Sequence, residues 1–179
     1  AHTLQSGHSN IMRVLVPQVL HVFFAQIMAG ISDVMEKAGY SVLICQSNEK
    51  YDNEVRNVET LLQQRIAGLL VSISEQTKDY DHFNQVIDSN IPLVFFDRTC
   101  KKIKASSVTT DDYQPAYNIV SHLIEKGYRR IAHLAGFTNL QLARQRLSGY
   151  KKALQDNGIQ FDSDLVIENG LNEENGRQS

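Results

Sequence analysis

The same order of elements occurs twice in this chain, and this repeat constrains the fold more than any other feature. Residues 11–46 read as strand, loop, helix and strand, and residues 130–167 read in the same way. Two α/β units of one design predict two lobes with a cleft between them. Open α/β sheets hold ligands at the carboxyl ends of their strands, so the repeat favours a small-molecule clamp.

Apolar runs alternate with amphipathic stretches along the chain, which is typical of right-handed βαβ crossovers and a parallel sheet. The helical faces are read from apolar residues at a 3.6 period, and they include Val34 in the first helix and Ile119 in a later one. We expect strands at 13–17, 42–45, 68–73, 92–96, 107–110, 131–135 and 165–167, with helices at 23–38, 79–89, 115–126 and 141–157 and an amphipathic helix through residues 55–66.

These elements predict an α/β fold of two Rossmann-like lobes, each a parallel sheet flanked by helices, with the second lobe incomplete in this chain. We assign residues 1–10 to a linker, 11–110 to the first lobe and 111–179 to the first part of the second lobe. The chain starts without Met and ends where a helix is expected to begin. We therefore interpret it as a fragment of a longer protein.

Composition narrows the class of protein. The formal net charge is −2, whereas a protein body that binds nucleic acid unaided is usually basic. No apolar run reaches the ~20 residues of a membrane helix, and the first ten residues are polar, unlike a signal peptide. The two cysteines, Cys45 and Cys100, form no C-x-x-C motif and fit a reducing cytoplasm.

Chemistry-bearing side chains follow three of the predicted strands. Phe23 follows the first strand, Asp97 and Arg98 follow the fourth, and Arg146 lies in the first turns of the helix after the strand at 131–135. An aromatic ring can stack on the apolar face of a sugar or on a base. Aspartate accepts hydrogen bonds from hydroxyl groups and arginine donates in a fixed fork, so this set suits a polyhydroxylated or heterocyclic ligand.

Each of these residues also has a structural interpretation. Phe23 can belong to the hydrophobic core, Asp97 and Arg98 can form a solvated loop pair, and Arg146 can be a surface charge. The six histidines show no H-x-x-x-H or H-E-x-x-H spacing, and neither a nucleophile elbow nor a P-loop motif is present. The sequence therefore indicates no catalytic residue, no metal site and no cofactor.

An ordered set of short motifs resembles the effector-binding core of bacterial transcription regulators of the LacI/GalR type, which are related to periplasmic sugar-binding proteins. The resemblance covers nearly all of the chain. Its landmarks are Val14-Leu15-Val16-Pro17 before Phe23-Phe24, Ala38-Gly39-Tyr40, Ile91-Pro92-Leu93-Val94 before Asp97-Arg98, Val108-Thr109-Thr110-Asp111-Asp112-Tyr113, Gly127-Tyr128-Arg129-Arg130-Ile131-Ala132 and Arg144-Gln145-Arg146-Leu147-Ser148-Gly149-Tyr150.

The resemblance implies roles for the matching residues. Phe23 would contact the effector, Asp97 and Arg98 would hydrogen-bond it, and Arg146 would clamp it from the second lobe. His21, which stands where the family commonly has Asn, is a further candidate ligand contact. Leu140 and Leu142 stand at the contact positions of the loop before Arg146, so that wall of the site is expected to be drier.

The resemblance also implies partners. Residues 1–10 resemble the family's hinge, in which a leucine, here Leu4, wedges into the minor groove of operator DNA. The expected protein is a cytoplasmic homodimeric regulator, a repressor that senses a sugar or a related molecule. Operator binding would need an N-terminal domain outside this chain, and no membrane is involved. Effector binding would favour one lobe angle and so alter the spacing of the two hinges.

Two alternatives share the fold. A periplasmic sugar-binding receptor would use the same clamp but would follow a secretion signal, whereas a regulator would follow a domain of about fifty residues with a helix-turn-helix. An enzyme on this architecture would need a catalytic group that the sequence does not show. The sequence upstream of Ala1 separates the first two possibilities.

Overall fold

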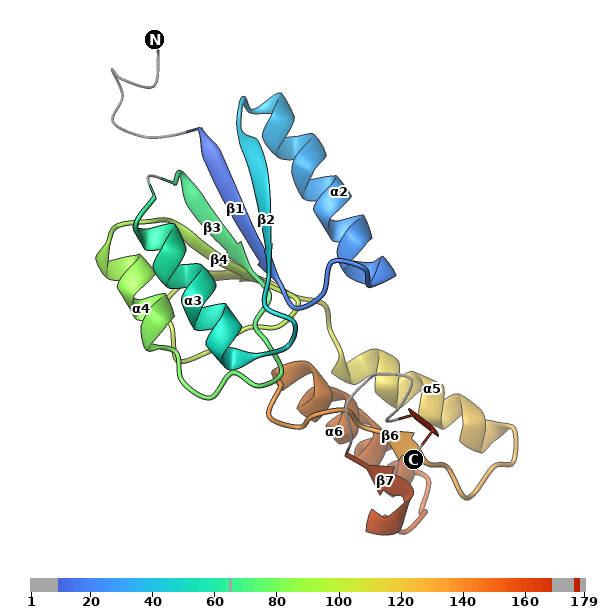
Figure 1. Cartoon of the computed structure of the whole chain (residues 1–179). Coiled ribbons are helices and arrows are strands. Elements are labelled where there is room, and N and C mark those ends of the chain that lie inside the picture. The colour runs from blue at the N-terminus through green and yellow to red at the C-terminus, as the bar shows by residue number, and fades with distance from the viewer. Residues whose placement is uncertain (1–9, 65, 169–175, 178–179) are drawn as a thin grey trace. The chain divides into compact units, whose positions relative to one another are not determined.

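The computed structural model describes residues 10–64, 66–168 and 176–177. The chain divides into two compact units, unit 1 (residues 1–109) and unit 2 (residues 110–179), and each contains its own sheet and helices (Figure 1). The predicted hinge leucine, Leu4, lies outside the described residues. Among the described helices, none is both long and apolar enough to cross a lipid bilayer.

Unit 1 is built on a five-stranded sheet with the order β2-β1-β3-β4-β5, and every pairing in it is parallel. The inner strand β1 is buried at Val14, Leu15 and Val16, as expected for a parallel strand covered on both faces. The parallel sheet predicted from the alternating pattern is therefore confirmed. The strands are β1 (Ile11–Val16), β2 (Ser41–Gln46), β3 (Gly68–Val71), β4 (Leu93–Phe96) and β5 (Ser106–Val108).

Three helices cover this sheet: α2 (Val22–Lys37), α3 (Tyr51–Leu62) and α4 (Asp81–Asp88). Figure 1 shows α2 on one face and α3 and α4 on the other. Helix α2 buries Phe24 and Met28 against Val14, Val16 and Phe96. With both faces covered, the open edge at the carboxyl ends of the strands is where loop side chains can gather.

Two helix positions predicted to face inward are exposed, namely Val34 on α2 and Ile119 on α5 (Tyr113–Glu125). At 3.6 residues per turn, Val34 lies roughly 100° around the helix from the midpoint of the buried pair Phe24 and Met28. Ile119 lies roughly 120° from the midpoint of the buried Val120 and Ile124 on the same rule. Both predictions were wrong because these residues stand at the margin of the apolar stripe.

Unit 2 contains a two-stranded parallel sheet, β6 (His133–Leu134) and β7 (Val166–Ile167), with helices α5 and α6 (Gln141–Asp156) and the short 3₁₀ helix η1 (Ser163–Leu165). The two long helices approach closely at Gly149, where an added Cβ would lie 2.4 Å from the carbonyl oxygen of Tyr113. The core behind them buries Val120, Ile124, Ile131, Tyr150, Ala153 and Leu154.

Helix α5 begins at Tyr113 rather than at the predicted residue 115. The Asp111 carboxylate accepts hydrogen bonds from the backbone N–H groups of Tyr113 (2.9 Å) and Gln114 (3.1 Å), which are donors that the first turn leaves without helical partners. Pro115 consequently occupies the first turn rather than the first position. The predicted helix ends agree with the structure better than this predicted start does. Gly39 and Gly127 follow α2 and α5 with φ of 80° and 95°, a conformation that glycine adopts without strain.

Candidate functional site

Asp97 and Arg98 lie directly after β4 and share one small region of unit 1. Asp97 has a φ of 58°, so the alternation of side chains along the strand stops there. The Arg98 Nε atom lies 3.8 Å from the Asp97 Oδ2 atom, and the two side chains are 12% and 15% exposed. The Ser72 hydroxyl donates to Asp97 Oδ2 at 3.4 Å from the end of the neighbouring strand β3. The pair is thus a partly buried feature of the sheet end, not a solvated loop.

Arg98 forms its closest ion pair with Glu49, a residue that sequence reasoning missed. Its Nη1 atom donates to both Glu49 carboxylate oxygens, at 2.9 and 2.7 Å, and lies 3.4 Å from the carbonyl oxygen of Ile73. Glu49 follows β2, which is separated from β4 by two strands, β1 and β3, in the sheet order. The sequence shows only an acidic residue soon after a predicted strand. The order of the strands is needed to show that this residue pairs with Arg98.

The Glu49 carboxylate is fixed by its own backbone and by a neighbouring amide. Asn48 and Glu49 both have left-handed backbone conformations, with φ of 56° and 59°, which side-chain-bearing residues adopt rarely. The N–H of Glu75 donates to Glu49 Oε2 at 2.9 Å. Burial and the charge of Glu49 raise the pKa of Glu75 above its usual value, and Arg98 opposes this in part.

Aromatic rings complete this part of unit 1. Phe24 is buried, and the Arg98 guanidinium lies over its ring with the Cζ atom 5.9 Å from the centroid. Phe23 meets Phe24 edge-on at 5.3 Å and His21 meets it at 6.0 Å. Phe23 is 42% exposed, so the structure leaves it outside the core. Phe23, His21 and Arg98 therefore meet around one buried ring, and Asp97 lies next to Arg98.

A buried polar network lies behind the loops that carry Glu49 and Glu75. The Glu54 carboxylate on α3 is fully buried and accepts from the Ser74 N–H (2.7 Å), the Ser74 hydroxyl (3.0 Å) and the Thr77 hydroxyl (2.8 Å). His82 Nε2 lies 3.1 Å from the same carboxylate, and the Ser74 and Ser47 hydroxyl oxygens lie 2.9 Å apart, within hydrogen-bond distance. The network joins the loops after β2 and β3 to α3 and α4.

Unit 2 supplies Arg146, the last of the predicted effector contacts, on the second turn of α6. Its Nε and Nη2 atoms both lie 2.7 Å from Asp112 Oδ1, and the side chains are 45% and 11% exposed respectively. The same helix begins after Leu140, which is buried together with Leu142. Both leucines are thus shielded from solvent, and their predicted role as a dry wall of the site stays a prediction.

His133 on β6 lies within the electrostatic reach of Arg146. Its ring stacks on Tyr150 with centroids 5.0 Å apart and planes 16° apart. Burial and the positive charge of Arg146 lower the pKa of His133 below its ordinary value. Its buried Nε2 atom has no hydrogen-bond partner in the described part of the chain. A neutral ring packed on an aromatic ring is a structural role.

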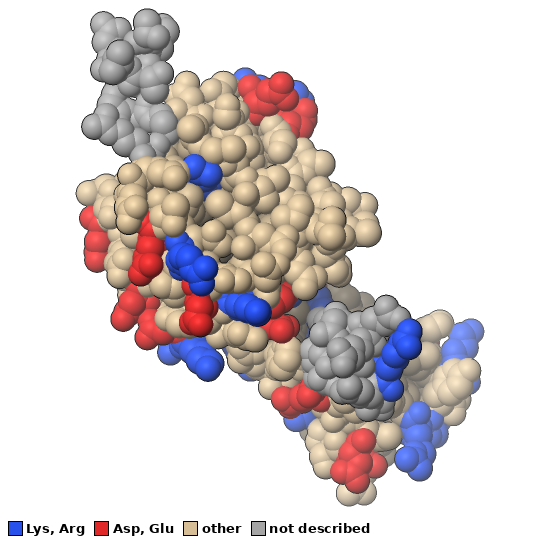
Figure 2. Space-filling view, in the orientation of Figure 1, with Lys and Arg blue, Asp and Glu red and all other residues tan. Residues whose placement is uncertain are grey.

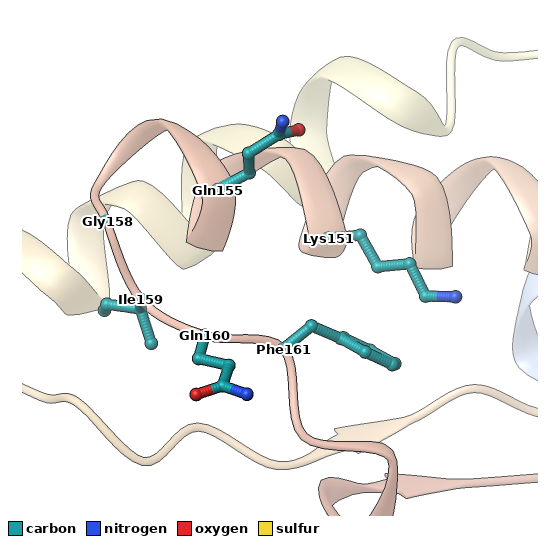
Figure 3. Close-up of a pocket in the computed structure, with 6 residues that line it drawn as sticks. All are labelled: Lys151, Gln155, Gly158, Ile159, Gln160 and Phe161. Carbon is teal, nitrogen blue, oxygen red and sulfur yellow. The ribbon is translucent and has the colours of Figure 1, made fainter.

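Unit 2 also has a shallow surface hollow after α6, lined by Lys151, Gln155, Gly158, Ile159, Gln160 and Phe161. In Figure 3 the Lys151 side chain extends toward the Phe161 ring, and its Nζ atom lies 4.5 Å from the ring centroid. The hollow follows the end of α6 and precedes β7, so it lies at the amino end of the small sheet and contains none of the predicted ligand contacts. Across the described residues, no group of three or more histidine, cysteine or acidic side chains could hold a metal ion.

Comparison with known proteins supplies the family. The model for periplasmic binding proteins and the sugar-binding domain of the LacI family matches residues 9–178. The chain is 26% identical over 94% of its length to the HTH-type transcriptional repressor PurR of Vibrio atlanticus (strain LGP32). Among solved structures, transcription regulator CcpA of Lactococcus lactis matches 96% of the chain with a TM-score of 0.87 and 25% identity.

A third relative, the Cra transcriptional dual regulator of Pseudomonas putida in complex with fructose 1-phosphate, matches 96% of the chain with a TM-score of 0.85 and 21% identity. This chain covers 50% of the PurR sequence, 62% of the CcpA chain and 62% of the Cra chain. Each unit is an α/β body with a parallel sheet, as in these regulators. The chain belongs to the LacI family and carries its periplasmic-binding-protein-type sugar-binding domain.

Proposed function

We propose that this chain is the effector-sensing part of a ligand-responsive transcriptional regulator, a repressor whose effector is a sugar or a related hydroxylated molecule. The observation that carries the proposal is the gathering of Phe23, His21 and Arg98 around Phe24, with Asp97 paired to Arg98, at the carboxyl end of the unit 1 sheet. This is the end of an α/β sheet at which ligands bind.

The side chains suit a hydroxylated ring. The partly exposed Phe23 offers an aromatic face for the apolar side of a sugar. Asp97 accepts from ligand hydroxyl groups, and Arg98 donates through the guanidinium nitrogens that Glu49 leaves available. Arg146 of unit 2 acts as a further donor to the effector, and His21 contributes a ring nitrogen. None of these residues is asked to perform bond chemistry, and no cofactor is required.

Regulation follows from the differential affinity of the effector for two conformations of the protein, which shifts their populations and thereby changes operator affinity. DNA is bound by a domain beyond this chain and by the hinge around Leu4, and the protein acts in the cytoplasm. Support comes from the relatives, which are named as transcriptional repressors and regulators. For the same reason we favour a regulator over a periplasmic receptor or an enzyme.

A homodimer is part of the proposal. The edge strand β2 exposes Leu43 and Ile44, and the neighbouring α2 exposes Val34. Figure 2 shows that the surface over β2 and α2 is mostly uncharged on the side in view. Contiguous exposed apolar side chains commonly mark protein interfaces, so we place the unit 1 part of the dimer contact here.

The test is a thermal-shift screen of the full-length regulator with sugars, sugar phosphates and nucleobases, followed by calorimetry of the best ligand. We expect at least one sugar to raise the melting temperature, and we expect Arg146→Ala to abolish its binding without changing the circular dichroism spectrum. Arg130→Ala, on the exposed surface of unit 2, is the matched control. Unchanged affinity in Arg146→Ala would refute the role of Arg146, and a screen in which only nucleobases bind would refute the sugar effector.

A further inference from the structure

The arginine expected to grip the effector from unit 1 is already neutralised by carboxylates. Glu49 lies 2.7 Å from Arg98 Nη1, and Asp97 lies 3.8 Å from Arg98 Nε. A third acidic residue, Glu75, lies nearby: its backbone N–H donates to Glu49, and the charge of Glu49 helps to raise the pKa of its carboxyl group. Two carboxylates, those of Glu49 and Asp97, therefore face one guanidinium, so negative charge exceeds positive charge in this part of unit 1.

The neutralising pair is built into the fold. Arg98 and Glu49 are only 12% and 16% exposed, so solvent screens their interaction less than at an open surface. Asn48 and Glu49 both hold a left-handed backbone conformation. Strained residues of this kind persist only where surrounding contacts determine them, and here those contacts are the Arg98 guanidinium and the Glu75 N–H.

The electrostatic consequences agree with this geometry. The raised pKa of Glu75, to which the charge of Glu49 contributes, reports that this region opposes a further negative charge. Unit 2 behaves similarly at its own arginine, since Arg146 is paired with Asp112 at 2.7 Å. Neither guanidinium is therefore an unpaired cation waiting for an anionic ligand.

We propose that Glu49 is a specificity-determining residue that reserves the unit 1 site for an uncharged or positively charged hydroxylated effector and excludes sugars that carry phosphate or carboxylate. The inference deepens the proposed function and depends on it for the location of the site. A phosphate group would have to displace Glu49 from Arg98 and would then lie beside Asp97 and Glu75. A neutral sugar needs only hydrogen bonds, which Asp97 and Arg98 can supply together.

Calorimetry on the full-length regulator tests this with matched probes: glucose and glucose 6-phosphate, fructose and fructose 1-phosphate, glucosamine, and inorganic phosphate. We expect the wild type to bind a neutral or amino sugar and to bind no phosphorylated member more tightly than its parent. Glu49→Gln keeps the size and hydrogen-bonding capacity of the side chain but removes its charge. We expect the variant to gain roughly tenfold in affinity for inorganic phosphate or a phosphorylated sugar, because a like-charge contact is relieved.

Glu59→Gln, on the exposed face of α3, controls for the loss of one negative charge, and its affinities should match the wild type. The inference is overturned if the wild type prefers a phosphorylated sugar, a result that leaves effector sensing intact, or if Glu49→Gln gains no affinity for phosphate. Gain of phosphate binding by Glu49→Gln without any sugar binding would support Glu49 and contradict the sugar effector. A melting temperature of Glu49→Gln within a few degrees of the wild type shows that the fold is retained.

Discussion

The two units hold their arginines in different ways. In unit 1 the Arg98–Glu49 pair is partly buried, with side chains 12% and 16% exposed, whereas Arg146 in unit 2 is 45% exposed. The closest N–O distance is 2.7 Å in both pairs. Exposed ion pairs contribute little to stability, so equal distances do not mean equal roles. Arg98 belongs to the framework of its unit, while Arg146 can change partner at small cost.

The cores behind the two arginines differ as well. Unit 1 buries the carboxylate of Glu54 among hydroxyl groups, a backbone amide and His82. Unit 2 relies on close helix packing at Gly149, and the buried Tyr150 hydroxyl donates to the Ile131 carbonyl oxygen at 2.9 Å. Polar contacts therefore fix the loops of unit 1, and shape complementarity fixes unit 2.

The largest expected effect is on the network of unit 1. Glu54→Ala removes the acceptor shared by Ser74, Thr77 and His82 and leaves their donors buried without it. Breaking a buried charged interaction in this way destabilises by about 3–5 kcal/mol, and we expect that loss in urea unfolding followed by circular dichroism. Glu59→Ala on the exposed face of the same helix should change stability little. Equal stability of the two variants would contradict the importance of the network.

Helix packing in unit 2 should be the next most sensitive feature. In Gly149→Ala the new methyl group would lie 2.4 Å from the Tyr113 carbonyl oxygen and 2.9 Å from the Tyr117 nitrogen, both rigid backbone atoms. We expect a loss of about 1–3 kcal/mol from overpacking. The matched change in unit 1, Gly68→Ala, meets the flexible end of Met12 first, at 2.9 Å, and should cost less. The order of the two melting temperatures checks this, and the reverse order would contradict it.

A smaller effect is expected on ligand binding at Asp97. Asp97→Ala should weaken effector binding by more than ~1 kcal/mol because a polar partner of the ligand is removed. Asp97→Asn keeps a residue type that tolerates the left-handed backbone, so it separates the loss of charge from backbone strain. Asp88→Asn on α4 is an exposed control. Wild-type affinity of Asp97→Ala in calorimetry would remove Asp97 from the site.

The smallest effect concerns pH and distinguishes the units. The pKa of His133 is lowered in the folded protein from its ordinary value of 6.5. Between the two pKa values, His133 is therefore protonated more in the unfolded chain than in the folded chain. Stability from His133 is therefore fully present above the ordinary value and declines as pH falls from it toward the lowered folded pKa.

Urea unfolding at several values between about pH 8 and about pH 5 should show this decline for unit 2. His133→Phe, which keeps a ring against Tyr150, should flatten it, whereas His122→Phe at an exposed position should not. A decline that persists unchanged in His133→Phe would assign it to another group.

The sequence was sufficient for the architecture because strand and helix periodicity is a local property. The alternation of apolar runs and amphipathic stretches predicted the parallel sheet, and the glycines after α2 and α5 predicted the helix ends. The positions of Val34 and Ile119 could not be predicted reliably, because a residue at the margin of an apolar stripe is buried only if a neighbouring element covers it.

The candidate site was predictable only in part. The carboxyl ends of the strands pointed to Asp97 and Arg98, but the partner of Arg98 depends on strand order and on the left-handed backbone at Glu49. Neither property leaves a local pattern.

Phe24 has a consequence for how such a protein can diversify. One ring fills the interior beside Met28 and also supports Arg98, Phe23 and His21. A substitution of Phe24 that improves folding alone would therefore also move the side chains proposed to select the effector. Stability and ligand specificity are therefore coupled at this position. A relative that evolves a change in one must compensate for its effect on the other.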